Sequence, residues 1–133
     1  MRSGIPDLRR NDRSEVKVII AGCRHFEHPA DYELVEAAVR ESGFEITEVV
    51  SGTARGIDRW GSTYATRHKI ACRPFYAQWR LHGKGAGMIR NQAMADHADA
   101  LIAVWDNRSK GTADMIRKAI GRGLPVFVYD AEL

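Results

Sequence analysis

The fold class of this chain is decided by the stretch VVSGTARGIDRWG (residues 49–61). Two valines run into a loop of small residues with two glycines and an arginine, and helical spacing begins at Ile57 and Asp58. A tight strand-to-helix turn needs glycine for its backbone. Glycines, hydroxyl groups and an arginine just before a helix N-terminus also favour binding of an anionic group such as phosphate.

The same order, a strand followed by a helix, recurs on both sides of this stretch. Apolar runs bounded by breakers predict strands at residues 16–22, 45–50, 70–76, 100–105 and 125–130. Helical spacing predicts helices at residues 29–43, 57–68, 88–98 and 111–123, with a polar, glycine-rich loop at 77–87. Nearly apolar strands that alternate with helices are typical of a parallel sheet covered on both faces. We therefore predict a single Rossmann-like α/β domain with a mostly parallel five-stranded sheet and helices on both faces.

The length and composition agree with one globular domain. The chain has 133 residues, of which 44% are hydrophobic and 28% are charged. We assign residues 16–133 to the domain and residues 1–15 to a flexible N-terminal tail, because this segment is charged and has no apolar run. The sequence also shows no apolar run long enough for a membrane span and no secretory signal. We therefore expect a cytoplasmic protein without a membrane partner.

The charge and the cysteine count argue against several classes of site. A net charge of +3 is weak for a dedicated binder of duplex DNA, whereas a small anionic ligand needs only a few well-placed arginines. Cys23 and Cys72 are too few and too far apart for a disulfide framework, so we expect two reduced thiols, with Cys23 as a small hydrophobic side chain. His25 and His28 lack partners at metal-ligand spacing, and the glycine motifs of dinucleotide-binding and P-loop proteins are missing. We expect neither a metal nor a cofactor.

The predicted fold places the ligand site at one edge of the sheet. In open α/β sheets, ligands bind beyond the carboxyl ends of the strands, where the strand order reverses. Glycine, arginine and small polar residues gather in the segments 22–26, 51–58, 76–91 and 106–112, which occupy that position. The predicted ligand-binding or phosphate-binding residues are Gly22, Arg24, Ser51, Gly52, Thr53, Arg55, Gly56, Asp58, Asn91, Asp106, Ser109, Gly111 and Thr112.

Several of these side chains suggest a specific contact. Arg55 can pair with a phosphate through two hydrogen bonds. Asp58, near a helix start, suits either a helix cap or a hydrogen bond from a ribose hydroxyl. Arg90 falls in the first turn of a predicted helix, where an arginine opposes the helix dipole, so it indicates a negatively charged partner. Trp79 with its neighbour Arg80 suits stacking on a base and covering of the core equally well.

Four ordered blocks of the sequence resemble the YspA-like branch of the SLOG superfamily, which also contains DprA-type DNA-processing proteins and the Lonely-guy enzymes. The resemblance covers residues 16–129 and rests on the blocks KVIIAGCRHF, VVSGTARGIDRWG, GMIRNQAMADHADALIAVWD and SKGTADMI. It implies a Rossmann-like fold that binds nucleotides or nucleotide-derived small molecules. Because relatives often dimerise, it also implies a possible homodimer.

The resemblance extends in part to the catalytic residues of the Lonely-guy enzymes, which cleave the N-glycosidic bond of nucleoside monophosphates. Those enzymes use an arginine before a helix, which Arg90 matches, and the last glutamate of a PGGxGTxxE motif. Here SKGTADM resembles a degenerate form of that motif, without the leading Pro-Gly-Gly. Met115 stands in place of the glutamate, and Asp114 precedes it. The resemblance therefore gives Arg90 and Asp114 as the candidate catalytic residues.

Three functions remain open from the sequence. The first is a module that binds a nucleotide derivative as a sensor or by sequestering it. The second is a nucleotide N-glycosidase, which requires a carboxylate beside the sugar, supplied by Asp114 or instead by Asp58 or Asp106. The displacement of Asp114 by one residue rotates it by about 100° on a helix, which weakens this assignment. The third is DprA-like binding of single-stranded DNA, against which the modest net charge argues.

Overall fold

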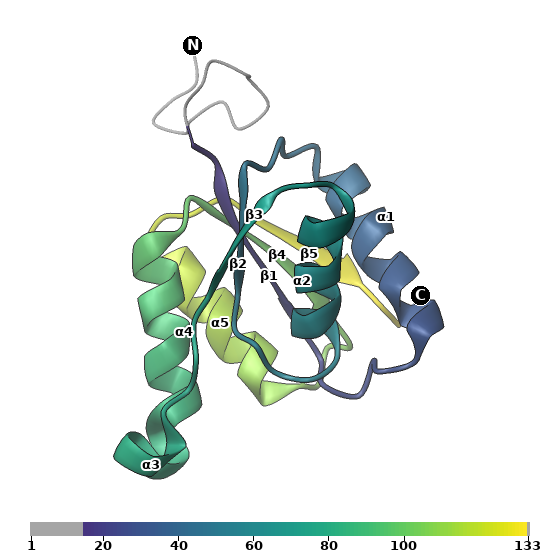
Figure 1. Cartoon of the computed structure of the whole chain (residues 1–133). Helices are drawn as coiled ribbons and strands as arrows, with labels where there is room; N and C mark the ends of the chain where they lie inside the picture. Colours follow the sequence, from purple (N-terminus) through teal and green to yellow (C-terminus); the bar gives the residue numbers. More distant parts are fainter. Residues whose placement is uncertain (1–14, 133) are drawn as a thin grey trace.

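The structure is a computed structural model that describes residues 15–132. Apart from Glu15, the N-terminal tail expected at residues 1–15 lies outside the described residues. Five parallel strands form one sheet in the order β3-β2-β1-β4-β5 (Figure 1). The strands are β1 (Lys17–Gly22), β2 (Glu48–Ser51), β3 (Ala71–Pro74), β4 (Ala100–Trp105) and β5 (Val126–Asp130). The predicted Rossmann-like fold is confirmed, with a sheet that is parallel throughout.

Helices cover both faces of this sheet. Helices α1 (Tyr32–Ser42) and α2 (Ile57–Arg67) pack on one face, and α4 (Ala86–His97) and α5 (Lys110–Gly121) pack on the other (Figure 1). Three short elements complete the fold: η1 (Pro29–Asp31), α3 (Trp79–His82) and η2 (Gly83–Gly85). Within residues 15–132, every helix is too short or too polar to cross a lipid bilayer.

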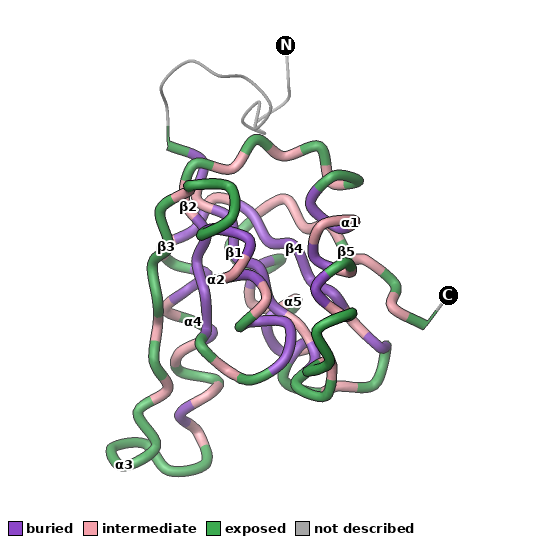
Figure 2. Tube along the Cα trace, turned by 45° about the vertical axis from the view of Figure 1, so that its right-hand side comes forward, coloured by how far each residue is buried: buried purple, intermediate pink, exposed green. Residues whose placement is uncertain are grey.

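The apolar sequence of the central strands follows from their burial on both faces. In β1, Val18 and Ile20 belong to the core under α1 and α2, whereas Ile19 belongs to the opposite core, with Met94 and Met115. Successive side chains of a strand point to opposite faces, so a strand between two helical layers has no polar side. Figure 2 shows the buried residues concentrated along β1 and β4.

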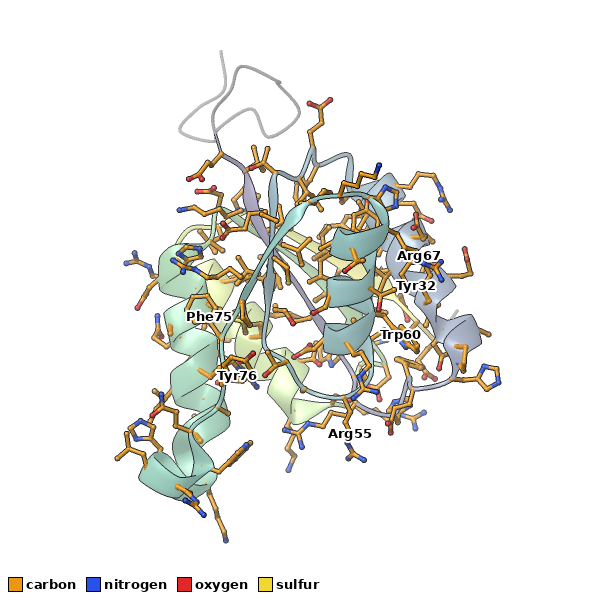
Figure 3. The ribbon with its side chains drawn as sticks, viewed as in Figure 1. Tyr32, Arg55, Trp60, Arg67, Phe75 and Tyr76 are labelled. Carbon is orange, nitrogen blue, oxygen red and sulfur yellow. The ribbon has the colours of Figure 1, made fainter. Side chains whose placement is uncertain are left out.

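Aromatic and cationic side chains join the two helices of one face. The guanidinium carbon of Arg67 lies 4.3 Å from the centre of the Tyr32 ring, and the Tyr32 and Trp60 rings meet edge to face at 6.2 Å (Figure 3). The indole nitrogen of Trp60 donates to the Phe26 carbonyl at 2.8 Å. These contacts anchor α1 and the loop after β1 on α2, and so fix one wall of the region beyond the strands.

The strand order reverses between β1 and β4. The connections from β1 through β2 to β3 run in one direction, and β4 and β5 lie on the other side of β1. Loops that leave the carboxyl ends of β1 and β4 therefore separate toward opposite faces and leave a crevice between them. This is the edge of the sheet to which the sequence assigned the ligand site.

Some predicted boundaries were wrong. The strands expected at 45–50 and 70–76 are shorter, because β2 begins at Glu48 and β3 covers only Ala71–Pro74. The segment expected to be a loop at 77–87 instead contains α3 and η2, and α4 begins at Ala86 rather than at residue 88. Gly87 lies inside the first turn of α4, and its low helix propensity hid the start of that helix.

Candidate functional site

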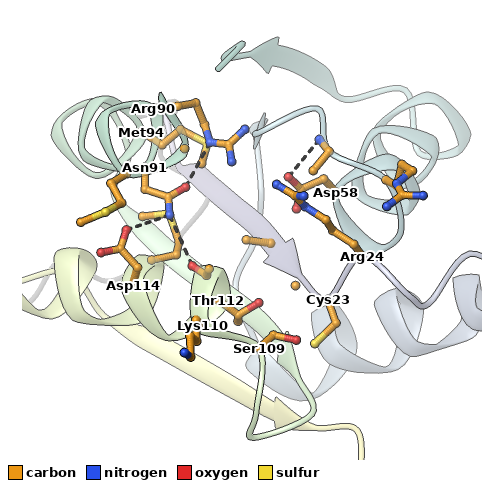
Figure 4. A pocket seen from close by; sticks show the side chains of 18 of the residues that line it. Cys23, Arg24, Asp58, Arg90, Asn91, Met94, Ser109, Lys110, Thr112 and Asp114 are labelled. Atoms are coloured by element: carbon orange, nitrogen blue, oxygen red, sulfur yellow. Dashed lines mark hydrogen bonds between the residues drawn. The ribbon is translucent and has the colours of Figure 1, made fainter. Parts of the chain in front are cut away.

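A cavity of about 750 Å³ lies at the reversal point of the strand order. The loops after β1 and β4, the turn between β2 and α2, and the facing sides of α4 and α5 form its walls (Figure 4). This volume falls within the range of pockets that hold cofactors and other small molecules.

Most of the residues predicted from the sequence line this cavity. They come from four separate segments of the chain, which the topology brings to one edge of the sheet. The predicted residues on its wall are Gly22, Arg24, Arg55, Asp58, Arg90, Asn91, Ser109, Gly111, Thr112 and Asp114. The predicted residues behind its wall are Ser51, Gly52, Thr53, Gly56 and Asp106.

The two hydroxyl groups expected to bind phosphate stabilise the turn after β2 instead. The Ser51 hydroxyl is fully buried; it accepts the Thr53 N–H at 3.1 Å and donates to the Asp58 carbonyl at 3.3 Å. The Thr53 hydroxyl donates to the Gly52 carbonyl at 2.6 Å, and Thr53 itself has a φ of 63°. Both hydroxyls bond to the loop's own backbone, and their contacts with a ligand stay a prediction.

The two glycines of this turn are required by the protein's own neighbouring atoms. Gly56 has a φ of 74°, and a Cβ atom there would lie 2.6 Å from the Arg24 carbonyl oxygen. A Cβ atom on Gly52 would lie 2.7 Å from Oδ2 of Asp58 and 3.1 Å from the guanidinium carbon of Arg90. Both glycines are therefore explained by protein atoms that lie too close to leave room for a side chain. These atoms belong to the loop after β1 at Gly56, and to the side chains of Asp58 and Arg90 at Gly52.

Asp58 is a buried carboxyl group on the cavity wall. It lies in the first turn of α2, is 5% exposed, and accepts the Ala54 N–H through Oδ2 at 3.2 Å (Figure 4). Burial raises the pKa of Asp58 to about 6, although the nearby charges of Arg90 and Arg24 oppose this shift. A carboxyl group with this pKa exchanges its proton close to neutral pH.

The guanidinium group of Arg90 is held in place on the cavity wall near Asp58. Nη1 donates to the Gly52 carbonyl, and Nε donates to Oδ1 of Asn91 at 3.1 Å. Burial lowers the pKa of Arg90, and the charge of Asp58 opposes this shift. Because α4 begins at Ala86, Arg90 lies in the second turn of the helix and not in the first, where the sequence had predicted it. Opposition to the helix dipole therefore does not explain Arg90, whereas its place on the cavity wall does.

Asp114 is an ion-paired carboxylate that positions Asn91. Its Oδ1 lies 2.6 Å from Nζ of Lys118 and 2.8 Å from Nη2 of Arg117, and its Oδ2 accepts from Nδ2 of Asn91 at 3.0 Å. Burial alone would raise the pKa of Asp114, but the hydrogen bonds from Lys118 and Asn91 and the adjacent charges lower it below its usual value. Asp114 is therefore better suited to a positioning role than to proton transfer. As a carboxylate it orients Asn91, which in turn accepts a hydrogen bond from Arg90.

Asp106 stabilises the loop between β4 and α5. Its Oδ1 accepts the N–H groups of Arg108 and Ser109, both at 2.8 Å, and its Oδ2 accepts the Ser109 hydroxyl at 3.2 Å. Burial opposes ionisation, yet these hydrogen bonds hold the pKa of Asp106 far below its usual range. Both oxygens of Asp106 are thus hydrogen-bonded within the protein, and its contact with a ligand stays a prediction.

The cavity wall carries an excess of positive charge. Its cationic side chains are Arg24, Arg55, Lys84, Arg90, Lys110 and Arg117, and its acidic side chains are Glu27, Asp58 and Asp114. Glu27 lies 3.7 Å from Arg55, and Asp114 pairs with Arg117. Among residues 15–132, no carboxylate oxygen lies within 4.0 Å of the charged nitrogens of Arg24, Lys84, Arg90 or Lys110. These unpaired cations suit an anionic ligand.

Sequence reasoning missed three cations of the cavity wall, Lys84, Lys110 and Arg117. Lys84 lies in the segment GKGAG and Lys110 in SKGT, and a lysine between small residues near a helix start was the signal available for both. Trp79 is 52% exposed, so it does not serve to cover the core.

These features define a class of protein: a Rossmann-like α/β domain with a cationic cavity at the reversal point of its sheet. No protein-family model matches the chain. The Gene 61 protein of Mycobacterium phage D29 is 36% identical over 89 residues, which cover 61% of this chain and 70% of the phage protein. The chain therefore belongs to the same family as that phage protein. Since the phage protein's name states no activity, function must be inferred from the site.

Proposed function

We propose that this protein binds a nucleotide or a nucleotide-derived small molecule in the cavity, as a sensor or by sequestering it. The proposal rests on a cavity of about 750 Å³ whose wall holds four cationic side chains without an ion-pair partner among residues 15–132. The sequence resemblance to the YspA-like branch of the SLOG superfamily supports the same ligand class.

Arg90 and Arg24 are the best candidates to bind a phosphate group. A guanidinium group carries five N–H donors, and Arg90 uses two of its nitrogens to hold its own position. The remaining donors can form charge-assisted hydrogen bonds with phosphate oxygens. Arg24 lies close enough to lower the pKa of Arg90, so an anion between the two would relieve their mutual repulsion.

Asp58 is the candidate partner of the sugar. Its Oδ2 is engaged with the Ala54 N–H, and the carboxyl group lies on the cavity wall. A carboxylate accepts through two oxygens, so it can also receive a hydrogen bond from a ribose hydroxyl.

A second function, cleavage of a nucleotide N-glycosidic bond, is favoured by one specific observation. Asp58 combines a pKa of about 6 with a place on the same wall as Arg90. Such a carboxyl group can donate or accept a proton at neutral pH, as glycoside cleavage requires. This version of the enzyme hypothesis assigns the acid–base role to Asp58 and leaves Asp114 as a positioning residue.

The experiment that separates the two functions is a ligand screen with recovery of the ligand. The protein is incubated with nucleoside monophosphates, nucleoside diphosphates, ADP-ribose and cyclic nucleotides, and binding is followed by thermal shift. Every ligand that stabilises the protein is then recovered and analysed by chromatography. Intact ligand supports the binding module, and free base with sugar phosphate supports the enzyme. If no nucleotide stabilises the protein, both proposals fail.

A further inference from the structure

A cluster of metal-type side chains lies at the end of β1 and β4, beside the groups used above. Cys23 and His25 follow β1, and Asp106 follows β4, so the cluster joins positions more than 80 residues apart in sequence. The Cys23 sulfur, an imidazole nitrogen of His25 and a carboxylate oxygen of Asp106 all lie within 4.8 Å of one another. Nε2 of His25 lies 3.0 Å from Oδ2 of Asp106.

We propose that Cys23, His25 and Asp106 bind a zinc ion, with the fourth coordination position open to the cavity. Sulfur, imidazole nitrogen and carboxylate oxygen are the donors that zinc takes in proteins, and three protein ligands leave one position for water or another ligand. The thiolate argues against Mg²⁺ and Ca²⁺, which prefer sites made of oxygen atoms. Cys23 and His25 line the cavity, so a metal ion here is accessible from it.

The surroundings of Asp106 and Cys23 already orient these two ligands. The Arg108 and Ser109 N–H groups fix Oδ1 of Asp106, so that Oδ2 faces His25. The backbone N–H of Asp106 donates to the Cys23 sulfur at 3.3 Å. Hydrogen bonds of this kind orient the ligands in protein metal sites and lower the cost of assembling them.

Of the three ligands, His25 has the most exposed side chain and the most freedom to move. Zinc–ligand distances of about 2.0–2.3 Å place the donor atoms of a tetrahedral site roughly 3.5 Å apart, so a separation of up to 4.8 Å has to shorten. The His25 side chain is 59% exposed, whereas that of Asp106 is 10% exposed. A rotation of the exposed imidazole ring can therefore adjust its nitrogen, already 3.0 Å from Oδ2 of Asp106, relative to the Cys23 sulfur.

The test titrates the full, untagged, metal-free chain with Co²⁺ and then displaces the cobalt with Zn²⁺. We expect one equivalent of cobalt, with a thiolate-to-cobalt charge-transfer band and the strong visible absorption of a four-coordinate site. Cys23→Ser should abolish the charge-transfer band, and His25→Ala should weaken zinc binding by at least about tenfold. Cys72→Ser is the matched control, because Cys72 is an exposed free thiol on β3, and it should change neither property.

Two results would overturn the zinc site: no charge-transfer band in the unmodified chain, or zinc affinity that is the same in His25→Ala as in the unmodified chain. The buried Cys23→Ser variant can fail to fold, whereas His25→Ala alters an exposed loop residue and keeps the test decisive. The titration uses no nucleotide, so its outcome is independent of the proposed ligand.

Discussion

Asp58 is a cavity side chain whose ionisation depends strongly on the fold. Its carboxyl group is buried, and its pKa rises from an ordinary value near 4 to about 6. The folded state thus holds the Asp58 proton more tightly than the unfolded chain does. The Asp58 contribution to the free energy of unfolding is therefore most favourable below pH 4, and it falls as pH rises from about 4 to about 6.

We expect Asp58→Asn to be more stable than the unmodified protein above pH 7, by up to about 3 kcal/mol, because it removes the cost of a buried charge. Below pH 4 this advantage should disappear, since Asp58 is then protonated in both states. Urea denaturation at a series of pH values measures the difference. A constant difference between the two proteins from pH 4 to pH 8 would contradict the raised pKa.

Arg55 belongs to the rim of the cavity, and its removal should affect binding without affecting stability. Its side chain is 67% exposed and its ion pair with Glu27 is 3.7 Å long, and exposed pairs of this kind stabilise proteins little. We expect Arg55→Ala to weaken nucleotide binding about tenfold, which corresponds to one charge-assisted hydrogen bond, and to leave the Tm nearly unchanged. Thermal denaturation and calorimetric titration of the variant check both parts. Equal affinity in Arg55→Ala would rule out its phosphate contact.

At the scale of the elements, the turn between β2 and α2 depends on Gly56. A side chain there meets the carbonyl groups of Cys23 and Arg24 and must also adopt a φ of 74°. We expect Gly56→Ala to lower the free energy of unfolding by at least about 2 kcal/mol, through the strained backbone and the displaced loop after β1. Urea denaturation measures this loss.

The matched control for Gly56 is Gly121, at the end of α5, where a Cβ atom would enter open space among the described residues. Gly121→Ala should be neutral or stabilising by about 0.5–1 kcal/mol, because alanine is the better helix former. If Gly56→Ala proved as harmless as Gly121→Ala, the turn would not be held by the contacts described above.

The central elements could be predicted from the sequence, and the outer ones only roughly. Strand β4 matches its predicted range because its residues are apolar on both faces and polar residues follow it. The strands at 45–50 and 70–76 were predicted too long because Ile46, Ile70 and Phe75 pack against the cores from outside the ladder. In the central strands the buried residues are also the residues that pair in the sheet. Near the ends of the outer strands, buried apolar residues lie outside the pairing, so an apolar run overestimates the length of the strand.

The sequence indicated the loops that line the cavity but not the direction of their side chains. The loops of the cavity could be predicted from residue types, because glycine and arginine are concentrated in the segments that follow the strands. Residue types could not show that Ser51 and Thr53 turn toward their own backbone. Nor could they place His25 beside Asp106, because that contact depends on the strand order.

At the scale of the whole molecule, the positive charge of the cavity contrasts with a nearly balanced chain. The sequence has 20 lysines and arginines against 17 acidic residues, yet the cavity has twice as many cationic as acidic side chains. A local concentration of charge attracts a small anion, whereas binding along a nucleic acid requires an extended basic surface.

We therefore expect single-stranded DNA to bind far more weakly than the best nucleotide, with a steep loss of affinity as salt rises. Fluorescence anisotropy of a labelled oligonucleotide, with unlabelled nucleotide as competitor, measures both affinities. Tight oligonucleotide binding at physiological salt that the nucleotide does not displace would favour the DNA-binding alternative instead.

The most direct test of nucleotide binding in this cavity is calorimetric titration of the best ligand from the thermal-shift screen. The titration compares the unmodified protein with Arg90→Ala and with Arg40→Ala, which removes an exposed arginine from α1. We predict one ligand per chain, an affinity lowered by at least about 100-fold in Arg90→Ala, and no change in Arg40→Ala. Equal affinity in all three proteins, or no binding of any nucleotide, would contradict a nucleotide site at the reversal point of the sheet.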